Sequence, residues 1–162
     1  MDICAMQIIF KGEWLDDTHI DYFGTLLKKC SKYQPRESWK IRYPDKIEPV
    51  SKNQKHIQIL HSCSDIITNS NGHWVCSYYD SKIIYIYDSL NLKQLHVHHK
   101  IYLEKLYPFY SFDEQPVQFP TVQKQPSNDC GVFAIAFAVS LLFDLQPNQI
   151  IYDHNLMRQH LA

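Results

Sequence analysis

The sequence predicts an α+β fold, and three observations lead to this prediction. Residues 17–30 repeat apolar side chains with the spacing of an amphipathic helix. Residues 131–143 (GVFAIAFAVSLLF) form an apolar run that is long enough for a buried helix. β-Branched and aromatic residues dominate three short segments, which we expect to form a central mixed or antiparallel sheet: 56–62, 73–79 and 83–88. No repeat or low-complexity linker divides the chain, so we expect residues 1–162 to form one domain.

The remaining elements follow from local patterns. The face of the first helix that we expect to be buried carries Ile20, Phe23, Leu26 and Leu27. Asp16 or Asp17 would cap this helix. Residues 31–55 have no sustained period and are typical of a long connection, which often shapes a substrate site. We further expect a helix over 98–107, an extended segment over 117–122 and a short terminal helix over 153–161.

Composition and charge narrow the class of protein. The net charge is −1 and no lysine- or arginine-rich block stands out, which gives a nucleic-acid partner little electrostatic support. The five cysteines lack C-x-x-C spacing, and neither a signal peptide nor an apolar stretch of transmembrane length is visible. We therefore expect a reducing, intracellular compartment, nucleus or cytoplasm, with no membrane partner. We also expect the protein to act as a monomer.

Cys130 stands where the apolar helix should begin. Asn128 or Asp129 is a suitable N-cap, so the thiol would lie in the first helical turn. There the unpaired backbone N–H groups and the positive end of the helix dipole favour the thiolate, which is the form that attacks carbonyl carbons. The structural alternative is a free cysteine that packs as a small hydrophobic side chain.

The hairpin of the second and third strands would bring a histidine and a carboxylate together. If Asp80 and Ser81 form a two-residue loop, His73 faces Asp88 across the hairpin. Directly opposed side chains have Cβ atoms about 5 Å apart, close enough for a carboxylate to hold an imidazole. A three-residue loop would instead place Trp74 opposite Asp88 and break this pairing.

These residues supply the parts of thiol chemistry. A cysteine nucleophile needs a base for its proton and a third group that orients the base, and His73 and Asp88 fit these roles. The oxyanion of the tetrahedral intermediate needs hydrogen-bond donors. We expect the backbone N–H of Cys130 and the carboxamide of Gln125 to provide them, with Gln123 as a weaker substitute.

Four short segments follow one another along the chain: Trp14-Leu15-Asp16-Asp17, His73-Trp74, Asp88, and Gln125 to Gly131. Together they resemble the WLND element, the HW element, the catalytic acid and the Q-x-DCG element of the Ulp1-like ubiquitin-like-protein peptidases, a family related to adenovirus-type proteases. The resemblance covers most of the chain. The sequence VQKQPSNDCGVFAIAFA is most similar to copies associated with transposable elements and viruses.

The resemblance implies a papain-like α+β fold with a triad in the permuted order His, Asp, Cys. It implies a cysteine peptidase that needs no cofactor or metal and cleaves after the Gly-Gly-like tail of a ubiquitin-like modifier such as SUMO, from a conjugate or a precursor. In the family, tryptophans that match Trp14 and Trp74 clamp this tail, and an acid that matches Asp17 meets a basic residue of the bound protein. Core packing is the other role open to the two tryptophans.

The chain departs from the family in two respects. Gln125 and Cys130 enclose four residues (PSND), one fewer than is usual. Loss of the Gln125 donor would lower the rate about 10²-fold. Residues 31–72 are also compact, so we expect less surface for gripping a folded modifier.

Three alternatives stay open at this point. The same chemistry suits a polyprotein-maturation protease of a virus or mobile element. A non-catalytic module that only binds a ubiquitin-like protein would fit the shortened loop, although it has no need of an intact triad. A metal site is suggested by His96, His98 and His99, but no cysteine lies near them at finger spacing, so we expect a solvated helix entrance there.

Overall fold

The α+β prediction is confirmed. The computed structural model describes residues 7–9, 11–30, 35–62 and 72–161, so the first four residues of the expected 31–55 connection lie outside the described part. The helices are α2 (Asp17–Cys30), α3 (Val97–Leu106), α4 (Cys130–Leu142) and α5 (His154–Leu161). The strands are β1 (His56–His61), β2 (Trp74–Tyr79) and β3 (Ile84–Tyr87). The short 3-10 helices are η1 (Ser38–Arg42), η2 (Pro44–Lys46) and η3 (Pro147–Gln149).

The three strands form an antiparallel sheet in the order β1-β2-β3. Its free edge at β3 receives the predicted extended segment. The Ile86 N–H donates to the carbonyl of Gln118 at 2.9 Å, and the Gln118 N–H donates to the carbonyl of Ile84 at 2.9 Å. This contact is an isolated parallel bridge between Tyr85 and Gln118, outside the three strands, so the sheet itself is the antiparallel one of the two forms expected.

Alternation along β2 creates two hydrophobic cores, because successive side chains of a strand point to opposite faces. Trp74, Cys76 and Tyr78 pack into the core that contains α4. Val75 and Tyr79 pack into a second core on the other face. All five side chains are buried, so β2 is covered on both sides.

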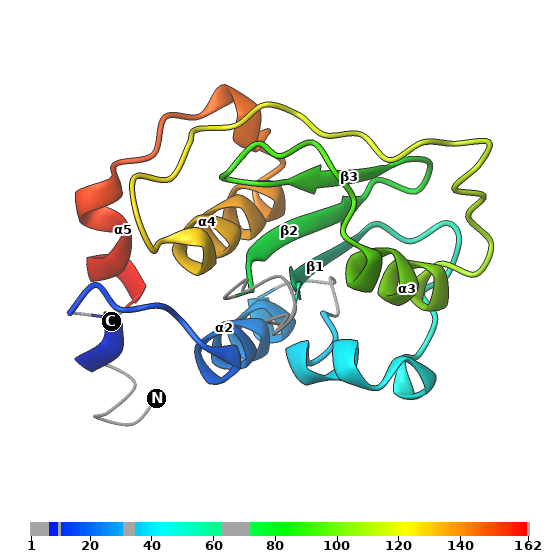
Figure 1. Ribbon diagram of the computed structural model, residues 1–162, viewed down its shortest axis with the longest axis horizontal. Helices are drawn as coiled ribbons and strands as arrows, with labels where there is room; N and C mark the ends of the chain where they lie inside the picture. The colour runs from blue at the N-terminus through cyan, green and yellow to red at the C-terminus, as the bar shows by residue number, and fades with distance from the viewer. Residues whose placement is uncertain (1–6, 10, 31–34, 63–71, 162) are drawn as a thin grey trace.

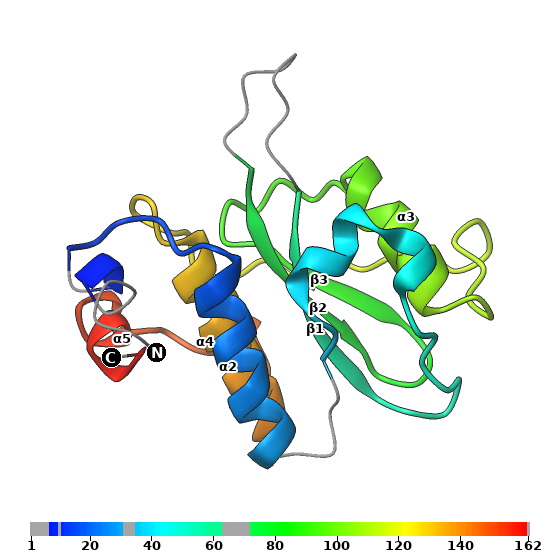
Figure 2. The ribbon, with the colours of Figure 1, turned by 90° about the horizontal axis from the view of Figure 1, so that it is seen from below.

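Helices cover both faces of the sheet (Figures 1 and 2). On one face α4 lies against β2 and β1, with α2 beside it. The buried residues of α4 lie all round the helix, as its unbroken apolar sequence predicted. On the other face lie α3 and the 3-10 helices η1 and η2, and Ile41 of η1 and Ile47, directly after η2, enter the second core. Across the described residues, no helix is both long and apolar enough to span a bilayer.

The start of α2 settles which aspartate caps it. The backbone N–H of His19 donates to Asp16 Oδ1 at 3.2 Å, the contact expected of an N-cap residue. Asp17 is therefore the first residue of the helix, and its exposed carboxylate is not used by the cap.

The predicted register of the β2–β3 hairpin is wrong by two residues. Tyr79 pairs with Ile84, and the Asp80 N–H donates to the carbonyl of Ile83 at 3.2 Å. The two-residue loop is thus Ser81 and Lys82 instead of Asp80 and Ser81. The reason is local: the Asp80 carboxylate accepts hydrogen bonds from the backbone N–H groups of Lys82 (2.8 Å) and Ile83 (2.7 Å), which holds Asp80 in the last pair before the loop.

The two-residue shift in register keeps the side chains of His73 and Asp88 on the same face of the sheet. Cys76 pairs with Tyr87, so Asp88 lies opposite Val75 and diagonal to His73. A shift of one residue would have turned Asp88 to the opposite face, whereas a shift of two preserves the face. A diagonal neighbour is still within reach of a long side chain such as histidine.

Ser81 adopts a left-handed backbone conformation with φ 84°. This conformation strains a residue that carries a Cβ, and glycine adopts it freely. We expect Ser81→Gly to raise the free energy of unfolding by about 0.5 kcal/mol, measured by denaturant titration. Ser81→Ala is the matched control because it keeps the Cβ and should give no gain. Equal stability of the glycine and alanine variants would contradict this turn.

Candidate active site

The side chains of His73 and Asp88 are in contact, as predicted, although along the diagonal of the hairpin. His73 Nε2 lies 2.6 Å from Asp88 Oδ1. Asp88 is buried, and its oxygens also accept the backbone N–H groups of Leu90 at 2.8 Å and Leu92 at 3.0 Å. These donors arise because the chain turns sharply after β3, with Asn91 at φ 54°. The carboxylate is therefore fixed from two sides before it meets the imidazole.

The electrostatics of this pair favour its charged form. Burial raises the pKa of Asp88, but the hydrogen bonds from His73, Leu90 and Leu92 outweigh burial and hold that pKa below its usual value. Burial likewise disfavours a protonated His73. The hydrogen bonds and charges of Asp88 and Cys130 prevail and raise the pKa of His73 to about 9. Because Nε2 faces Asp88, Nδ1 is the ring nitrogen left for the Cys130 thiol.

Cys130 is the first residue of α4, as predicted, and it lies in the first core with 8% of its surface exposed. Asp129 is the N-cap residue, but its side chain makes no capping hydrogen bond. Its backbone carbonyl still accepts a hydrogen bond of the helix, from the Phe133 N–H at 2.9 Å. The first-turn N–H groups beside the sulfur are thus not occupied by the cap carboxylate.

Gln125 lies next to the acid loop and is held there by Ser89. Its backbone N–H donates to the Ser89 carbonyl at 3.0 Å, and its Oε1 accepts the Ser89 hydroxyl at 2.5 Å. Its Nε2 donates to the carbonyl of Ser127 at 2.5 Å, which leaves the second hydrogen of the amide for another acceptor. The short PSND loop therefore curls back over the amide.

Gln123 serves a structural purpose instead. Its Nε2 donates to the Tyr152 carbonyl at 3.1 Å, and its Oε1 accepts the Tyr152 backbone N–H at 2.7 Å. Both ends of the carboxamide are engaged in holding the segment that leads to α5. Gln123 is thus bound to the Tyr152 backbone, whereas Gln125 is held beside the acid loop by Ser89.

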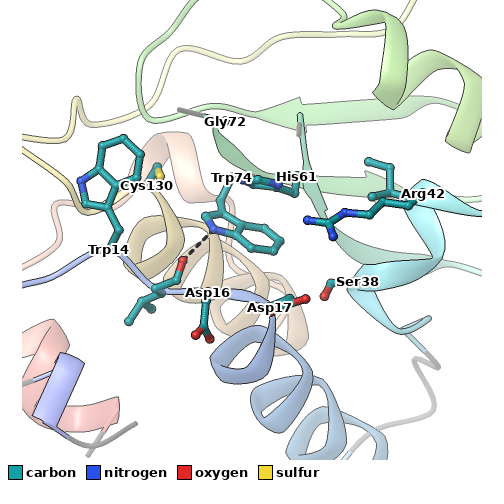
Figure 3. A pocket seen from close by; sticks show the side chains of 11 residues that line it. Trp14, Asp16, Asp17, Ser38, Arg42, His61, Gly72, Trp74 and Cys130 are labelled. Atoms are coloured by element: carbon teal, nitrogen blue, oxygen red, sulfur yellow. Dashed lines mark hydrogen bonds between the residues drawn. The ribbon is translucent and has the colours of Figure 1, made fainter. Parts of the chain in front are cut away.

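A pocket of about 260 Å³ adjoins Cys130 and contains both predicted tryptophans (Figure 3). Trp14 stands beside the sulfur with 42% of its surface exposed. Trp74 lines the same pocket but is buried, and its indole N–H donates to the Leu15 carbonyl at 2.9 Å. Core packing therefore describes Trp74, whereas Trp14 is available to a ligand. Asp17 lines the same pocket from the start of α2.

Gly131 allows the wall of this pocket to close. A Cβ at Gly131 would lie 3.0 Å from Leu15 Cβ and 3.4 Å from Trp74 Cδ1. Glycine after Cys130 thus lets the Trp14-Leu15 segment pack directly against the start of α4. The wall and the thiol are consequently positioned by the same helical turn.

His61 and Arg42 are site residues that the sequence did not suggest. The His61 ring packs on Trp74 with centroids 4.3 Å apart, and Arg42 lies at the far end of the pocket (Figure 3). Burial, followed by the positive charges of Arg42 and His73, lowers the pKa of His61 to about 4, so this ring is neutral. The pairing of His61 with Trp74 across β1 and β2 was the available signal, but it required the β1–β2 register.

The histidine tract at the start of α3 is only partly the solvated helix entrance that we expected. His96 is the N-cap of α3 and accepts the His98 N–H at 3.2 Å. His99 is buried, which lowers its pKa to about 3, and its Nε2 has no partner among the described residues. Within that part of the chain, no three metal-binding side chains are grouped to hold an ion.

Neither a scan against protein-family models nor a search of curated proteins finds a match for this sequence. Solved structures do match. The SUMO protease Ulp1 with its catalytic cysteine oxidised to a sulfinic acid superposes with a TM-score of 0.70 at 15% identity, covering 99% of this chain and 80% of that one. The C-terminal Ulp1 protease domain in complex with Smt3, the yeast ortholog of SUMO, gives 0.70 at 18% identity with the same coverage. A de-sumoylating protease gives 0.55 at 15% identity, covering 99% of this chain and 77% of that one.

The chain thus combines an α+β fold with a thiol at the start of a buried helix and a His–Asp contact at the sheet on which that helix packs. Within the α+β class its fold is Ulp1-like. At these identities the similarity establishes the architecture, and the chemistry rests on the residues of this chain.

The pKa values of the His–Asp pair predict how it contributes to stability. His73 is raised above its ordinary 6.5, so its contribution is fully present below pH 6.5 and is lost as the pH rises through about 9. Asp88 is lowered from 3.8, so its contribution is present above pH 3.8 and is lost as the pH falls below that value. The His73–Asp88 pair therefore stabilises the fold most between pH 3.8 and pH 6.5, where both contributions are present.

A double-mutant cycle of His73→Gln and Asp88→Asn measures this contribution. We expect a coupling energy of about 1–3 kcal/mol at pH 6, typical of a charge-assisted hydrogen bond, and less than half of it at pH 10. Denaturant unfolding at the two pH values gives the four free energies. A coupling energy that is the same at both would mean that the imidazole is neutral at pH 6.

Proposed function

We propose that residues 1–162 form the catalytic domain of a cysteine peptidase that cleaves after the small-residue tail of a ubiquitin-like modifier. One observation carries the proposal: a buried carboxylate holds Nε2 of His73, while the thiol of Cys130, at the first residue of α4, adjoins the same ring. This arrangement meets the requirements for an activated thiol, which are a base within reach, an orienting acid and a helix N-terminus.

In the proposed mechanism, Nδ1 of His73 takes the proton of the Cys130 thiol. The thiolate attacks the carbonyl carbon of the last tail residue, and the carbonyl oxygen becomes an oxyanion. The Cys130 backbone N–H and the Gln125 amide donate to this oxyanion. His73 then gives its proton to the leaving amine, the C–N bond breaks and a thioester remains. Water, deprotonated by His73, hydrolyses the thioester and regenerates the thiol.

Asp88 holds His73 in orientation throughout these steps and stabilises the imidazolium between proton transfers. Its low pKa supports this role, because a carboxyl that stays ionised keeps its attraction for the ring. The reaction uses only side chains and water, so the proposal includes no cofactor or metal.

The shape of the pocket supports the proposal that the substrate tail is narrow. Trp14 and Trp74 lie on the approach to Cys130, and the space between Leu15 and α4 is closed by direct packing at Gly131. A Gly-Gly-like tail fits such a channel because it has no side chains to exclude. Asp17 is exposed at the pocket edge and is available to a basic residue of the modifier. The Ulp1-like fold supports this class of substrate, since one of the matched structures is a complex with Smt3.

A reducing compartment, nucleus or cytoplasm, belongs to the proposal because the nucleophile must remain a thiol. Cys76 and Cys130 are both free in the described part of the chain. We propose that the catalytic unit acts as a monomer, since one chain supplies Cys130, His73 and Asp88.

The proposal is tested with activity probes, each a ubiquitin-like protein that carries an electrophile at its C-terminus. We expect one probe to form an adduct that maps to Cys130, and Cys130→Ala to abolish both the adduct and substrate cleavage. Cys76→Ala is the matched control, because Cys76 is fully buried and should leave labelling intact. If no probe reacts while iodoacetamide still modifies Cys130 rapidly, the substrate is another protein, such as a polyprotein. If Cys130 is inert to both, a binding module remains.

The role of Gln125 has its own test. We expect Gln125→Ala to lower kcat about 10²-fold with little change in KM, because the lost donor acts on the oxyanion and not on the bound substrate. Gln115→Ala makes the same chemical change at an exposed position outside the site and serves as the control. Unchanged kcat in Gln125→Ala would mean that the shortened loop keeps this amide from the oxyanion.

A further inference from the structure

The carboxylate of Asp129, one residue before Cys130, is turned away from the helix that it begins. Aspartate at an N-cap position normally accepts an N–H of the first turn. Here Asp129 makes no such bond, although its side chain is almost completely buried. A buried carboxylate requires partners, so the residues that hold it elsewhere are of interest.

The closest partners come from α5, while the Ser127 hydroxyl lies 3.4 Å from Asp129 Oδ2. Arg158 donates from Nε at 2.8 Å and from Nη2 to Asp129 Oδ1, and His154 Nε2 contacts Asp129 Oδ2. Burial raises the pKa of Asp129, but the hydrogen bonds and charges of His154 and Arg158 prevail and hold it below its usual value. The carboxylate is thus ionised, and both of its oxygens are occupied.

The same guanidinium also holds the segment that leads to the pocket. Arg158 Nη1 donates to the Ile9 carbonyl at 3.2 Å, and Nη2 donates to the Glu13 carbonyl at 2.8 Å. Glu13 immediately precedes Trp14. Figures 1 and 2 show this N-terminal segment lying beside α5. The partly buried side chain of Arg158 therefore joins the start of α4 to the segment that carries the exposed Trp14.

Without these contacts, the Asp129 carboxylate has an obvious alternative partner. It could rotate to the first-turn N–H groups of α4, which it would occupy as an ordinary cap. It would also bring a negative charge toward the sulfur, and a like charge within a few ångströms disfavours a thiolate. In the described part of the chain, the other titratable or charged groups around Cys130 are His73, with Asp88 behind it, and those of the pocket: Asp16, Asp17, Arg42 and His61.

We propose that Arg158 is a positioning residue that keeps the Asp129 carboxylate off the first turn of α4, so that the N–H groups there remain available to the Cys130 thiolate and the oxyanion. The inference rests on the proposed function, in which Cys130 is the nucleophile. His154 assists through the second oxygen, but Arg158 makes the larger set of contacts.

The test measures the rate of Cys130 alkylation by iodoacetamide against pH, with the adduct mapped to Cys130. This readout needs no knowledge of the substrate. We expect Arg158→Ala to slow alkylation at pH 7 about tenfold and to move the pH profile to higher pH. Arg158→Lys should lie between the two, because a single ammonium cannot make all the contacts of the guanidinium fork. Gln159→Ala, at an exposed neighbour on α5, is the control and should match the wild type.

The double variant Asp129→Ala/Arg158→Ala separates positioning from simple tethering of α5. It removes both the charge and the capping oxygen, so we expect its alkylation rate at pH 7 to recover to within about threefold of wild type. Millimolar guanidinium should also partly restore Arg158→Ala. Thermal unfolding of each variant reports the stability that is lost, which we do not expect to recover in the double variant.

Three results would be decisive against these ideas, and they differ. The inference is overturned if Arg158→Ala folds and its Cys130 is alkylated at the wild-type rate. If Arg158→Ala does not fold, a wild-type alkylation rate in Arg158→Lys overturns the inference instead. A double variant as slow as the single one also overturns it, since Arg158 would then act only as a tether. If wild-type Cys130 reacts like an ordinary thiol and His73→Ala changes nothing, the proposed function itself fails.

Discussion

The antiparallel pairing of β2 with β3 is the constraint on which the candidate site depends. It determines which side chains share a face, and it places Asp88 diagonal to His73 so that the two meet at 2.6 Å. The same alternation gives β2 two buried faces, one for α4 and one for the second core. A strand buried on both sides has little freedom to slip, because a slip of one residue would exchange its faces. The register of the sheet therefore determines the geometry of the His73–Asp88 pair.

The loop that follows Asp88 connects this pair to the segment before the nucleophile. Asn91 exchanges two hydrogen bonds of 2.9 Å with the backbone of Val122, and Ser89 binds both the backbone and the side chain of Gln125. The acid, the candidate oxyanion donor and the approach to α4 thus form a continuous hydrogen-bonded frame. Preorganisation of this kind is what electrostatic stabilisation of an oxyanion requires.

The pocket wall is built around the start of α4. Trp74 donates to the Leu15 carbonyl, Leu15 packs where Gly131 lacks a Cβ, and Arg158 holds the carbonyls that precede Trp14. Segments from both ends of the chain therefore converge on the turn that carries Cys130. Because of this convergence, we expect a substitution in α5 to change the reactivity of the Cys130 thiol.

The sequence by itself determined the elements whose signals are local. The helical period of α2, the strands rich in β-branched and aromatic residues, the apolar run of α4 and the position of Cys130 in its first turn were all predicted, because they depend on neighbours a few residues apart. The His73–Asp88 contact was predicted too, but only because an error of two residues in the turn preserves the strand face. Only the tertiary structure decided the partner of Asp129, the burial of His99 and the place of His61 on Trp74. Each of these depends on a segment distant in sequence, and no local pattern states which distant segments will pack together.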